Sequence, residues 1–345
     1  MTINLVDTRT PEILVSMHRP DHNIAAYPKL KIFHRSSGVS VMFFHDGVDI
    51  LPELAQEGIL SHSIVYFTFS WFASEKSLKH VAGQLRKTFD IIGESGKDRI
   101  RFLLNSHDEY RCARSVLPEA CCVLFNNSAF INENSFRPSR QQKIYDTIYN
   151  ARPNAFKRHE LTVGIKNKAY IAYDWKVVDI DLNSYGPSKI FRNMKGAEVP
   201  DALSQAKTGL MLSSEEGACY ASLEYLLCGL PVISTESVGG RDEFYNESNS
   251  LICQPSAIAV AEGVRLALDR LADGTFAPDK IRFGAILRMN HFRNILQQNL
   301  SSSLQALGED PPSPKLLSEK INETNKLWKY RNMRIKKLAQ VSGTT

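Results

Sequence analysis

The chain has 345 residues, of which 43% are hydrophobic and 23% are charged. These values are typical of a soluble globular protein and exclude a collagen-like, a mainly disordered and a disulfide-scaffold chain, and the length predicts two domains of about 100–200 residues each. The formal net charge of +5 is confined to one end. Residues 315–345 hold eight Lys and Arg against two Asp and Glu, whereas residues 1–150 hold 17 against 16 and residues 151–314 hold 17 against 19. A nucleic-acid partner is therefore not expected, since phosphate contacts need a basic face on the folded domain.

The cysteines and the apolar segments are those expected of a cytoplasmic protein. The six cysteines form no C-x-x-C pair with a matching second pair, and several lie in apolar runs such as CCVLF (121–125), as buried thiols in a reducing compartment do. The first residues, MTINLVDTRTPEILV, lack the basic and apolar regions of a secretory signal. The sequence contains no stretch of 18 or more apolar residues that could span a membrane.

Short apolar runs alternate with helix-compatible polar segments over the first 140 residues. This alternation predicts an α/β layer with a mainly parallel sheet. The predicted strands are residues 39–44, 63–69, 100–105 and 121–126, and the predicted helices are residues 49–58, 75–88 and 108–117. A polar connector, NENSFRPSRQQ (132–142), is the predicted domain boundary.

A second strand–helix series follows the connector. Its predicted strands are residues 145–150, 169–174, 208–214, 231–237 and 250–255, and its predicted helices are residues 157–167, 200–206, 218–229 and 256–273, the last with Ser256 as N-cap. Two such series predict two Rossmann-like, doubly wound α/β domains facing a cleft. We place the N-terminal domain at residues 1–140, the C-terminal domain at residues 141–310 and a basic tail at residues 311–345.

The most informative segment is SSEEGACYASLEYLLCGLPVIST (213–235). Its predicted strand ends at two serines, the EEG sequence forms a turn, and the helix that follows carries Glu224 about two turns in. Gly217 lets the backbone approach a ligand closely, and the N–H groups of the helix N-terminus are available to an anion or to sugar hydroxyls. Without context, the same glutamates also fit an acidic first turn that stabilises the helix dipole.

This segment, together with the downstream VGGRDEF (238–244), resembles the E-x7-E element of the retaining glycosyltransferases of family 4, which have the two-domain GT-B fold. In that family the first Glu contacts the donor sugar and the second holds the ribose of the nucleotide, and these positions are Glu216 and Glu224. The family has an aromatic or aliphatic residue and then Gly where this chain has Ala and Cys. The donor-binding residues implied by the resemblance are Glu224, Gly217, Ala218, Cys219, Gly239 and Gly240.

A basic pair precedes this motif by about 60 residues. The segment ARPNAFKRHEL (151–161) follows a predicted strand and places Arg152 and Lys157 five residues apart. Arg makes bidentate contacts to phosphate oxygens and Lys acts as a point charge, so such a pair suits a diphosphate, although solvated surface charge is the alternative. The family carries an Arg and a Lys at this spacing, which bind the donor's diphosphate. The resemblance thus implies that Glu216, Arg152 and Lys157 are the catalytic residues.

The N-terminal half offers weaker signals. The family often has a His near the reaction centre in this domain, and we take His45 and His107 as acceptor-side candidates. FNNSAFINENSF (125–136) is similar to the family's segment that leads into the linker between the domains. The absence of P-loop, G-x-G-x-x-G and G-x-S-x-G patterns argues against a P-loop NTPase, an NAD enzyme and an α/β-hydrolase. A literal D-x-D at 179–181 lacks the strand–turn context of a metal site, so we expect neither a metal nor another cofactor.

The sequence therefore predicts a metal-independent, retaining glycosyltransferase of the kind found in polysaccharide biosynthesis. It would move a sugar from a nucleotide diphosphate sugar to a saccharide, lipid-linked or small-molecule acceptor. A nucleotide-sugar epimerase or a phosphorylase on the same fold, and a non-catalytic nucleotide-sugar-binding or assembly protein, remain open. The tail either packs on the N-terminal domain or forms a basic amphipathic helix at 315–345 that makes the protein peripheral to an anionic membrane. The apolar residues of the tail that would pack are Leu317, Ile321, Trp328 and Ile335.

Overall fold

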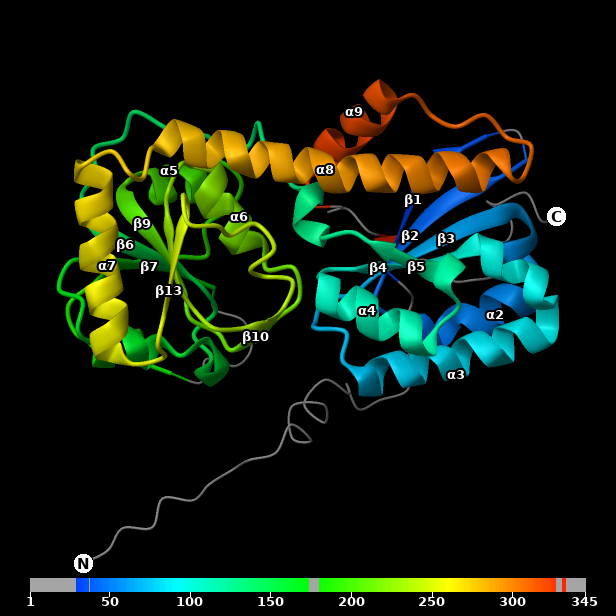
Figure 1. Cartoon of the computed structure of the whole chain (residues 1–345), viewed down its shortest axis with the longest axis horizontal. Helices are drawn as coiled ribbons and strands as arrows, with labels where there is room; N and C mark the ends of the chain where they lie inside the picture. Colours follow the sequence, from blue (N-terminus) through cyan, green and yellow to red (C-terminus); the bar gives the residue numbers. More distant parts are fainter. Residues whose placement is uncertain (1–28, 37, 174–179, 327–330, 333–345) are drawn as a thin grey trace, which may run out of the picture.

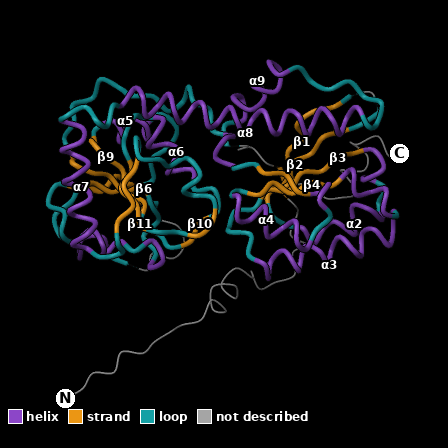
Figure 2. The backbone as a smooth tube through the Cα atoms, viewed as in Figure 1, coloured by secondary structure: helices purple, strands orange, loops and turns teal. Residues whose placement is uncertain are grey.

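The computed structural model describes residues 29–36, 38–173, 180–326 and 331–332 of the chain. Within these residues, two six-stranded sheets lie side by side, each with its own helices (Figure 1). We call the first sheet with its helices the N-terminal lobe and the second sheet with its helices the C-terminal lobe. A long helix, α8, runs along both lobes (Figure 2).

The sheet of the N-terminal lobe is buried on both faces. Its strand order is β14 (Arg331–Asn332), β1 (Lys29–Arg35), β2 (Ser40–His45), β3 (Ser63–Thr68), β4 (Ile100–Leu104) and β5 (Cys122–Leu124), with β2 to β5 parallel and β1 antiparallel to both of its neighbours. Side chains alternate between two cores, because Val41 and Phe43 face one and Met42 and Phe44 face the other. The helices α2 (Leu51–Gln56), α3 (Glu75–Ile92) and α4 (His107–Val116) share one face, as right-handed crossovers between strands added in one direction require.

The sheet of the C-terminal lobe is parallel throughout. Its order is β13 (Ser250–Cys253), β11 (Val232–Thr235), β9 (Ala206–Met211), β6 (Tyr145–Asn150), β7 (Lys168–Ala172) and β8 (Lys189–Arg192), and its helices are α5 (Glu198–Ser204), α6 (Tyr220–Leu227) and α7 (Ala257–Ala272). Counted along the chain, this is the Rossmann order, and its direction reverses between β6 and β9. Ligands of such sheets bind beyond the carboxyl ends of the strands at that reversal, so the segments after β6 and β9 mark the candidate site.

Helix α8 (Pro278–Gln305) connects the lobes and covers the remaining face of the first sheet (Figure 1). At about 1.5 Å per residue its 28 residues reach roughly 42 Å. Toward its C-terminal end, Asn299 Oδ1 accepts a hydrogen bond from the Tyr66 hydroxyl at 2.8 Å, and Ser303 Oγ accepts one from Arg101 at 3.0 Å. Buried Arg293 donates to the carbonyl of Ala129 at 2.9 Å. The helix thereby holds the segment that follows β5 against the N-terminal sheet.

Most predicted elements are confirmed, and one is wrong. Residues 157–167 do not form a helix but two 3-10 turns, Ala155–Lys157 and His159–Thr162, separated by Arg158 with φ +53°. Thr162 and its two successors, Val and Gly, are weak helix formers, while buried apolar residues four apart imitate a helical stripe. The strands and long helix that the sequence analysis did not predict are β1, β8, β14, α8 and the two short strands β10 (Glu215–Glu216) and β12 (Val238–Gly239).

The tail begins with α9 (Pro314–Thr324), capped by the Ser313 side chain. Leu317 and Ile321 are buried in the core that also contains Phe33, and Lys320 Nζ donates to the Phe33 carbonyl at 2.8 Å. Because these apolar side chains face protein, they are not available to a membrane surface. Trp328 and Ile335, the other two predicted packing residues, lie outside the described residues. Among the helices of the described part of the chain, none has the length and apolarity needed to cross a membrane.

Candidate functional site

A buried ion pair lies at the strand-order reversal of the C-terminal lobe. Lys157, from the loop after β6, donates from Nζ to Oε1 of Glu216, from the segment after β9, and the two side chains are 12% and 9% exposed. Ser213 Oγ donates to the same carboxylate oxygen at 2.6 Å. Glu216 belongs to β10 (Glu215–Glu216), which pairs in parallel with β12 (Val238–Gly239). The structure thus brings together two residues that the sequence predicted as catalytic, 59 positions apart.

Two further arginines support the segments around this ion pair, and the sequence analysis did not assign either of them. Arg158 donates to the Leu212 carbonyl and, at 2.7 Å, to Thr235 Oγ1, so it ties the Lys157 loop to the ends of β9 and β11. Arg241, whose side chain is fully buried, donates to the Ser213 carbonyl at 2.5 Å and to Asp242 Oδ1 at 2.6 Å. Both arginines lie in segments that the sequence analysis discussed, Arg158 in KRHEL and Arg241 in VGGRDEF.

The third predicted catalytic residue, Arg152, is more exposed than this pair. Arg152 is in the same loop, two residues after β6 ends, and its side chain is exposed. The loop itself is fixed by the Tyr149 hydroxyl, which donates to the Lys157 carbonyl at 2.6 Å. Burial holds the pKa of Tyr149 well above its usual value, so this hydroxyl keeps its proton and the hydrogen bond.

Helix α6 begins immediately beyond Glu216. Its N-cap, Cys219, has φ +51°, in the left-handed region that costs a residue with a side chain about 1–2 kcal/mol. Ala218 is buried, and its carbonyl accepts from Ser128 Oγ of the N-terminal lobe at 2.9 Å. The backbone here has the geometry that favours the glycine found in the resembling family, although the chain supplies Cys.

Glu224 lies on α6 and is 3% exposed. Its carboxylate oxygen Oε2 accepts from Asn150 Nδ2, at the end of β6, at 3.3 Å. Its other oxygen, Oε1, accepts from Lys326 Nζ, which comes from the segment after α9. Glu224 therefore lies at the same strand ends as Glu216, and its second partner is a residue that the sequence analysis did not consider.

The two lobes are in contact at the glycines of the site. A Cβ on Gly217 would lie 2.7 Å from the Ser70 carbonyl oxygen, and one on Gly240 would lie 2.6 Å from that of Asn105. Gly239, which pairs with Glu216 in the two-stranded ribbon, has φ +101° and leaves no room for a Cβ beside the Glu216 carbonyl. Loops of the N-terminal lobe therefore pack directly on the backbone around Glu216, and only glycine permits this approach.

The two predicted acceptor-side histidines lie in different surroundings. His45 ends β2, and its Nδ1 is 3.0 Å from Thr68 Oγ1. His107 begins α4, and both its backbone N–H and its ring contact the carboxylate of Glu243 across the lobes, at 3.0 and 3.1 Å. The structure thus places His107 in a contact between lobes and keeps His45 at the carboxyl end of a strand of the N-terminal sheet.

Two buried ionisable groups stand next to the site without having been predicted. Glu109 is fully buried and accepts from the backbone N–H groups of Ala73 at 3.0 Å and Asn105 at 2.5 Å, and burial raises its pKa to about 7. His159 is fully buried between the rings of Tyr149 and Tyr170, and neither ring nitrogen has a hydrogen-bond partner among the residues that the structure describes. Burial, aided by the charge of neighbouring Lys157, lowers the pKa of His159 to about 3.

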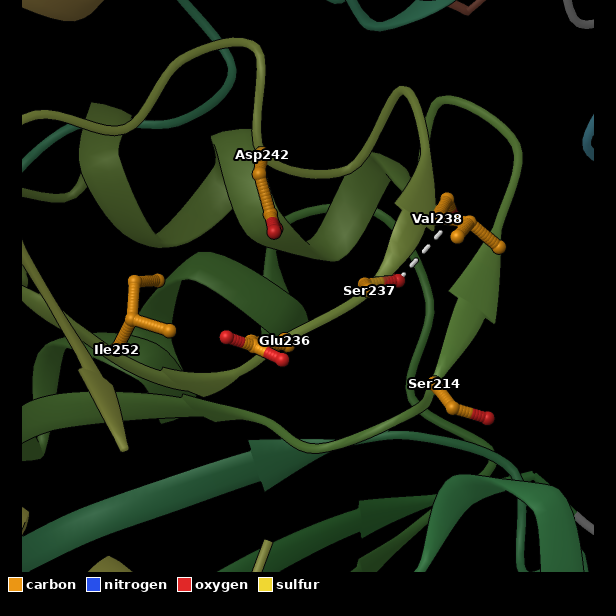
Figure 3. Close-up of a pocket in the computed structure, with 6 residues that line it drawn as sticks. All are labelled: Ser214, Glu236, Ser237, Val238, Asp242 and Ile252. Carbon is orange, nitrogen blue, oxygen red and sulfur yellow. Dashed lines mark hydrogen bonds between the residues drawn. The ribbon is translucent and has the colours of Figure 1, made fainter. Parts of the chain in front are cut away.

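A depression of about 440 Å³ lies beside the β10–β12 ribbon (Figure 3). None of the predicted site residues lines it, and its charged residues are the acids Glu236 and Asp242. Two carboxylates would repel a diphosphate, so this depression is not the place for one. Within the described residues, no three His, Cys, Asp or Glu side chains are grouped to hold a metal ion.

Solved structures with a similar arrangement of two lobes identify the fold of this protein. The fold is similar to that of Anabaena Alr3699/HepE in complex with UDP and glucose (TM-score 0.58, 13% identity, 75% of this chain and 77% of that chain). It is also similar to a glycosyltransferase from Rickettsia africae ESF-5 (TM-score 0.51, 12% identity, 75% and 81%) and to sucrose-phosphate synthase from Thermosynechococcus elongatus (TM-score 0.53, 15% identity, 77% and 74%). The protein has the GT-B fold, as the resemblance implied.

Sequence comparison is more specific for one part of the chain. Residues 188–271, which include Glu216, Glu224 and the glycine loop, match the family model described as glycosyl transferases group 1. One of the subunits of human phosphatidylinositol N-acetylglucosaminyltransferase is 38% identical over 85 residues, which are 24% of this chain and 17% of that protein. The chain therefore matches less than a fifth of the length of this curated relative.

Proposed function

We propose that the protein is a retaining glycosyltransferase that uses a nucleotide diphosphate sugar as donor. The observation that carries this proposal is the meeting of Lys157 and Glu216 at the strand-order reversal, next to the N-terminus of the helix that bears Glu224. The family match of residues 188–271 supports it. So do the UDP complexes among the structures with a similar fold.

Each group has a chemical task in this proposal. Glu224 accepts hydrogen bonds from the ribose hydroxyls, and Glu216 accepts them from the donor sugar. Lys157 and Arg152 face the diphosphate, together with the N–H groups at the start of α6. In the structure Lys157 neutralises Glu216, so the arrival of an anionic donor gives this ammonium a second partner and frees acceptor positions on the carboxylate.

The reaction then needs no protein nucleophile. As the bond between the sugar's anomeric carbon and the phosphate oxygen breaks, negative charge grows on the β-phosphate, where Lys157 and Arg152 stabilise it more than in the ground state. The departing phosphate accepts the proton of the acceptor hydroxyl on the same face. The new bond therefore forms on that face, and the anomeric configuration is retained. Because the two side-chain cations supply the positive charge, we expect turnover to persist in EDTA.

The test begins with donor identification. UDP-glucose, UDP-N-acetylglucosamine and GDP-mannose are screened by thermal shift, since a bound donor raises the melting temperature by mass action. The donor found is then used in hydrolysis and transfer assays with Lys157→Ala and Glu216→Gln. Lys157→Ala should lower kcat by about 100-fold or more, the usual loss when one group that stabilises transition-state charge is removed. Glu216→Gln should also lower turnover, because it weakens the acceptor that holds the donor sugar.

A matched control is available in the same lobe. Lys207→Ala removes an ion pair with Asp146, in which Lys207 is 42% exposed, and should leave turnover unchanged. Normal turnover in folded Lys157→Ala and Glu216→Gln would contradict the proposed site. An epimerised donor formed in the absence of acceptor would identify an epimerase, and donor binding without any turnover would identify a nucleotide-sugar-binding protein.

A further inference from the structure

The ion pair between Lys326 and Glu224 joins the tail of the chain to the middle of the candidate donor site. The Lys326 side chain is 15% exposed, and Glu224 is 3% exposed. The ammonium also lies 5.1 Å from the ring centroid of Phe136 and 5.4 Å from that of Tyr220. Lys326 thus fills a polar position with an aromatic lining, in the manner of a bound cationic ligand.

The backbone that delivers Lys326 is anchored and strained. The Lys326 N–H donates to the Phe130 carbonyl at 2.7 Å, and Asn325 Oδ1 accepts from the backbone N–H of Asn132 at 2.9 Å. Both Asn325 and Lys326 have positive φ values, +30° and +61°, which side-chain-bearing residues rarely adopt. Such strain persists only where other contacts compensate for it, and the contact with Glu224 is the one that ligand binding would remove.

We propose that Lys326 takes, on Oε1 of Glu224, the hydrogen-bonding position of a ribose hydroxyl of the donor, and that nucleotide binding displaces the ammonium group from that oxygen. The proposal rests on the proposed function, because it takes Glu224 as the residue that holds the ribose. An ammonium group and a ribose hydroxyl are both hydrogen-bond donors to a carboxylate oxygen. Each oxygen of buried Glu224 already accepts one hydrogen bond, from Asn150 on Oε2 and from Lys326 on Oε1, so a ribose hydroxyl that bonds Oε1 competes with the ammonium group there.

The displacement has a measurable consequence for affinity. A ligand that binds only the fraction of molecules in which the site is open has its dissociation constant raised by the reciprocal of that fraction. If Lys326 occupies the site about nine-tenths of the time, its removal lowers the Kd for a nucleotide about tenfold. An analogue without ribose hydroxyls gains nothing, because it forms no bond with Glu224 for which Lys326 competes.

The experiment is calorimetric titration of the full chain with UDP and GDP, and with the 2′,3′-dideoxy form of whichever binds. Lys326→Met keeps an unbranched side chain between the aromatic rings without the charge, and Lys326→Ala is the second variant. Both should bind the nucleotide about threefold to tenfold more tightly than the unchanged chain, and both should bind the dideoxy analogue with an unchanged Kd. Lys320→Ala, which removes another lysine contact of the tail, should change neither Kd.

The outcomes separate the two proposals. Weaker or equal nucleotide binding by folded Lys326 variants overturns the displacement of Lys326 and leaves the proposed function intact. An equal gain for the dideoxy analogue also overturns it, because competition at the ribose hydroxyls would then be absent. If neither nucleotide binds the unchanged chain or any variant, both proposals fail.

Discussion

The side-chain amide of Asn126 donates a hydrogen bond to the carbonyl oxygen of Gly240 at 2.7 Å, from the N-terminal lobe to the glycine loop of the C-terminal lobe. The same amide nitrogen donates to the Asn105 carbonyl at 2.8 Å, and Asn126 is fully buried. One side chain thus satisfies two carbonyls that face each other across the lobes. A Cβ on Gly240 would collide with Asn105, so the two backbones are already at their closest approach.

We predict that Asn126→Ala weakens the contact between the lobes. The substitution leaves the carbonyls of Asn105 and Gly240 without this donor, and an unsatisfied buried polar group costs about 1–3 kcal/mol. The free energy of unfolding, measured with urea, should fall by that amount, and the radius of gyration from solution scattering should rise.

A matched control distinguishes loss of a buried amide from loss of the contact between lobes. Asn127 donates from its side chain to the Phe69 carbonyl at 3.2 Å, within the N-terminal lobe. Asn127→Ala should lower stability without expanding the molecule. An unchanged radius of gyration in Asn126→Ala would show that other contacts, such as that between His107 and Glu243, hold the lobes together without it.

A second prediction concerns the left-handed residue before α6. Cys219→Gly relieves about 1–2 kcal/mol of backbone strain and costs about 0.5–1 kcal/mol of chain entropy, so the variant should be more stable by roughly 0.5–1 kcal/mol. Cys219→Val should be less stable, because a β-branched residue tolerates positive φ poorly. Denaturant unfolding of both variants measures the difference.

The control for this prediction is a cysteine in ordinary helical backbone. Cys112 lies within α4, where Gly is about 1 kcal/mol less favourable than a good helix former. Cys112→Gly should therefore destabilise the protein while Cys219→Gly stabilises it. Effects of the same sign at both positions would mean that φ at Cys219 does not determine its stability.

The sequence predicted the elements whose signal is local and missed those that depend on distant partners. β3 and β4 were found because their buried residues 64–67 and 102–104 read as continuous apolar runs, as in parallel strands that are covered on both faces. Helix α8 was missed because exposed Phe283 and Leu287 add apolar residues outside its buried stripe and blur the helical period.

The residues of the candidate site were likewise predicted where their signal is local and missed where they depend on distant partners. The strand–turn–helix pattern placed Glu224 correctly on the helix, α6, whereas Glu216, which was predicted to lie in a turn, belongs to the two-residue strand β10 that pairs with β12. The role of Arg241 depends on carbonyls after two different strands, and that of Lys326 on a glutamate 102 positions away. Such partners are set by the strand order and by the path of the tail, which a motif of a few residues does not specify.

A third prediction follows from the buried imidazole beside Lys157. The pKa of His159 is about 3 in the folded protein and 6.5 in an unfolded chain, so the unfolded state binds an additional proton between these values. Stability from this residue is present above pH 6.5 and is lost as the pH falls toward 3. Between pH 7.5 and pH 5 the loss is about 2 kcal/mol.

His159→Phe tests this by keeping an aromatic ring between Tyr149 and Tyr170 without a titrating group. We compare the free energies of unfolding of the variant and the unchanged chain, measured with urea. The difference between them should shift by about 2 kcal/mol in favour of the variant between pH 7.5 and pH 5, whatever its value at pH 7.5. Parallel pH profiles for the two proteins would contradict the prediction.

The last prediction concerns Glu109 and has the opposite sign. Its pKa rises from 4.5 in an unfolded chain to about 7 in the folded protein, so the folded state binds the additional proton. The stability from this carboxyl is present below pH 4.5 and is lost as the pH rises through 7, by about 2 kcal/mol between pH 5 and pH 7.5. As the pH rises from 5 to 7.5, the free energy of unfolding falls because of Glu109 and rises by a similar amount because of His159. In the unchanged chain these two groups together should therefore change the stability little over this range.

Glu109→Gln separates the two contributions. A Gln side chain, like a protonated carboxyl, offers one acceptor oxygen to the N–H groups of Ala73 and Asn105 and does not titrate. The variant should therefore become more stable, relative to the unchanged chain, by about 2 kcal/mol as the pH rises from 5 to 7.5, and Glu109→Gln combined with His159→Phe should restore a flat profile. A pH-independent difference between Glu109→Gln and the unchanged chain would mean that Glu109 is ionised throughout this range. In that case its two backbone hydrogen bonds outweigh the cost of burying its charge.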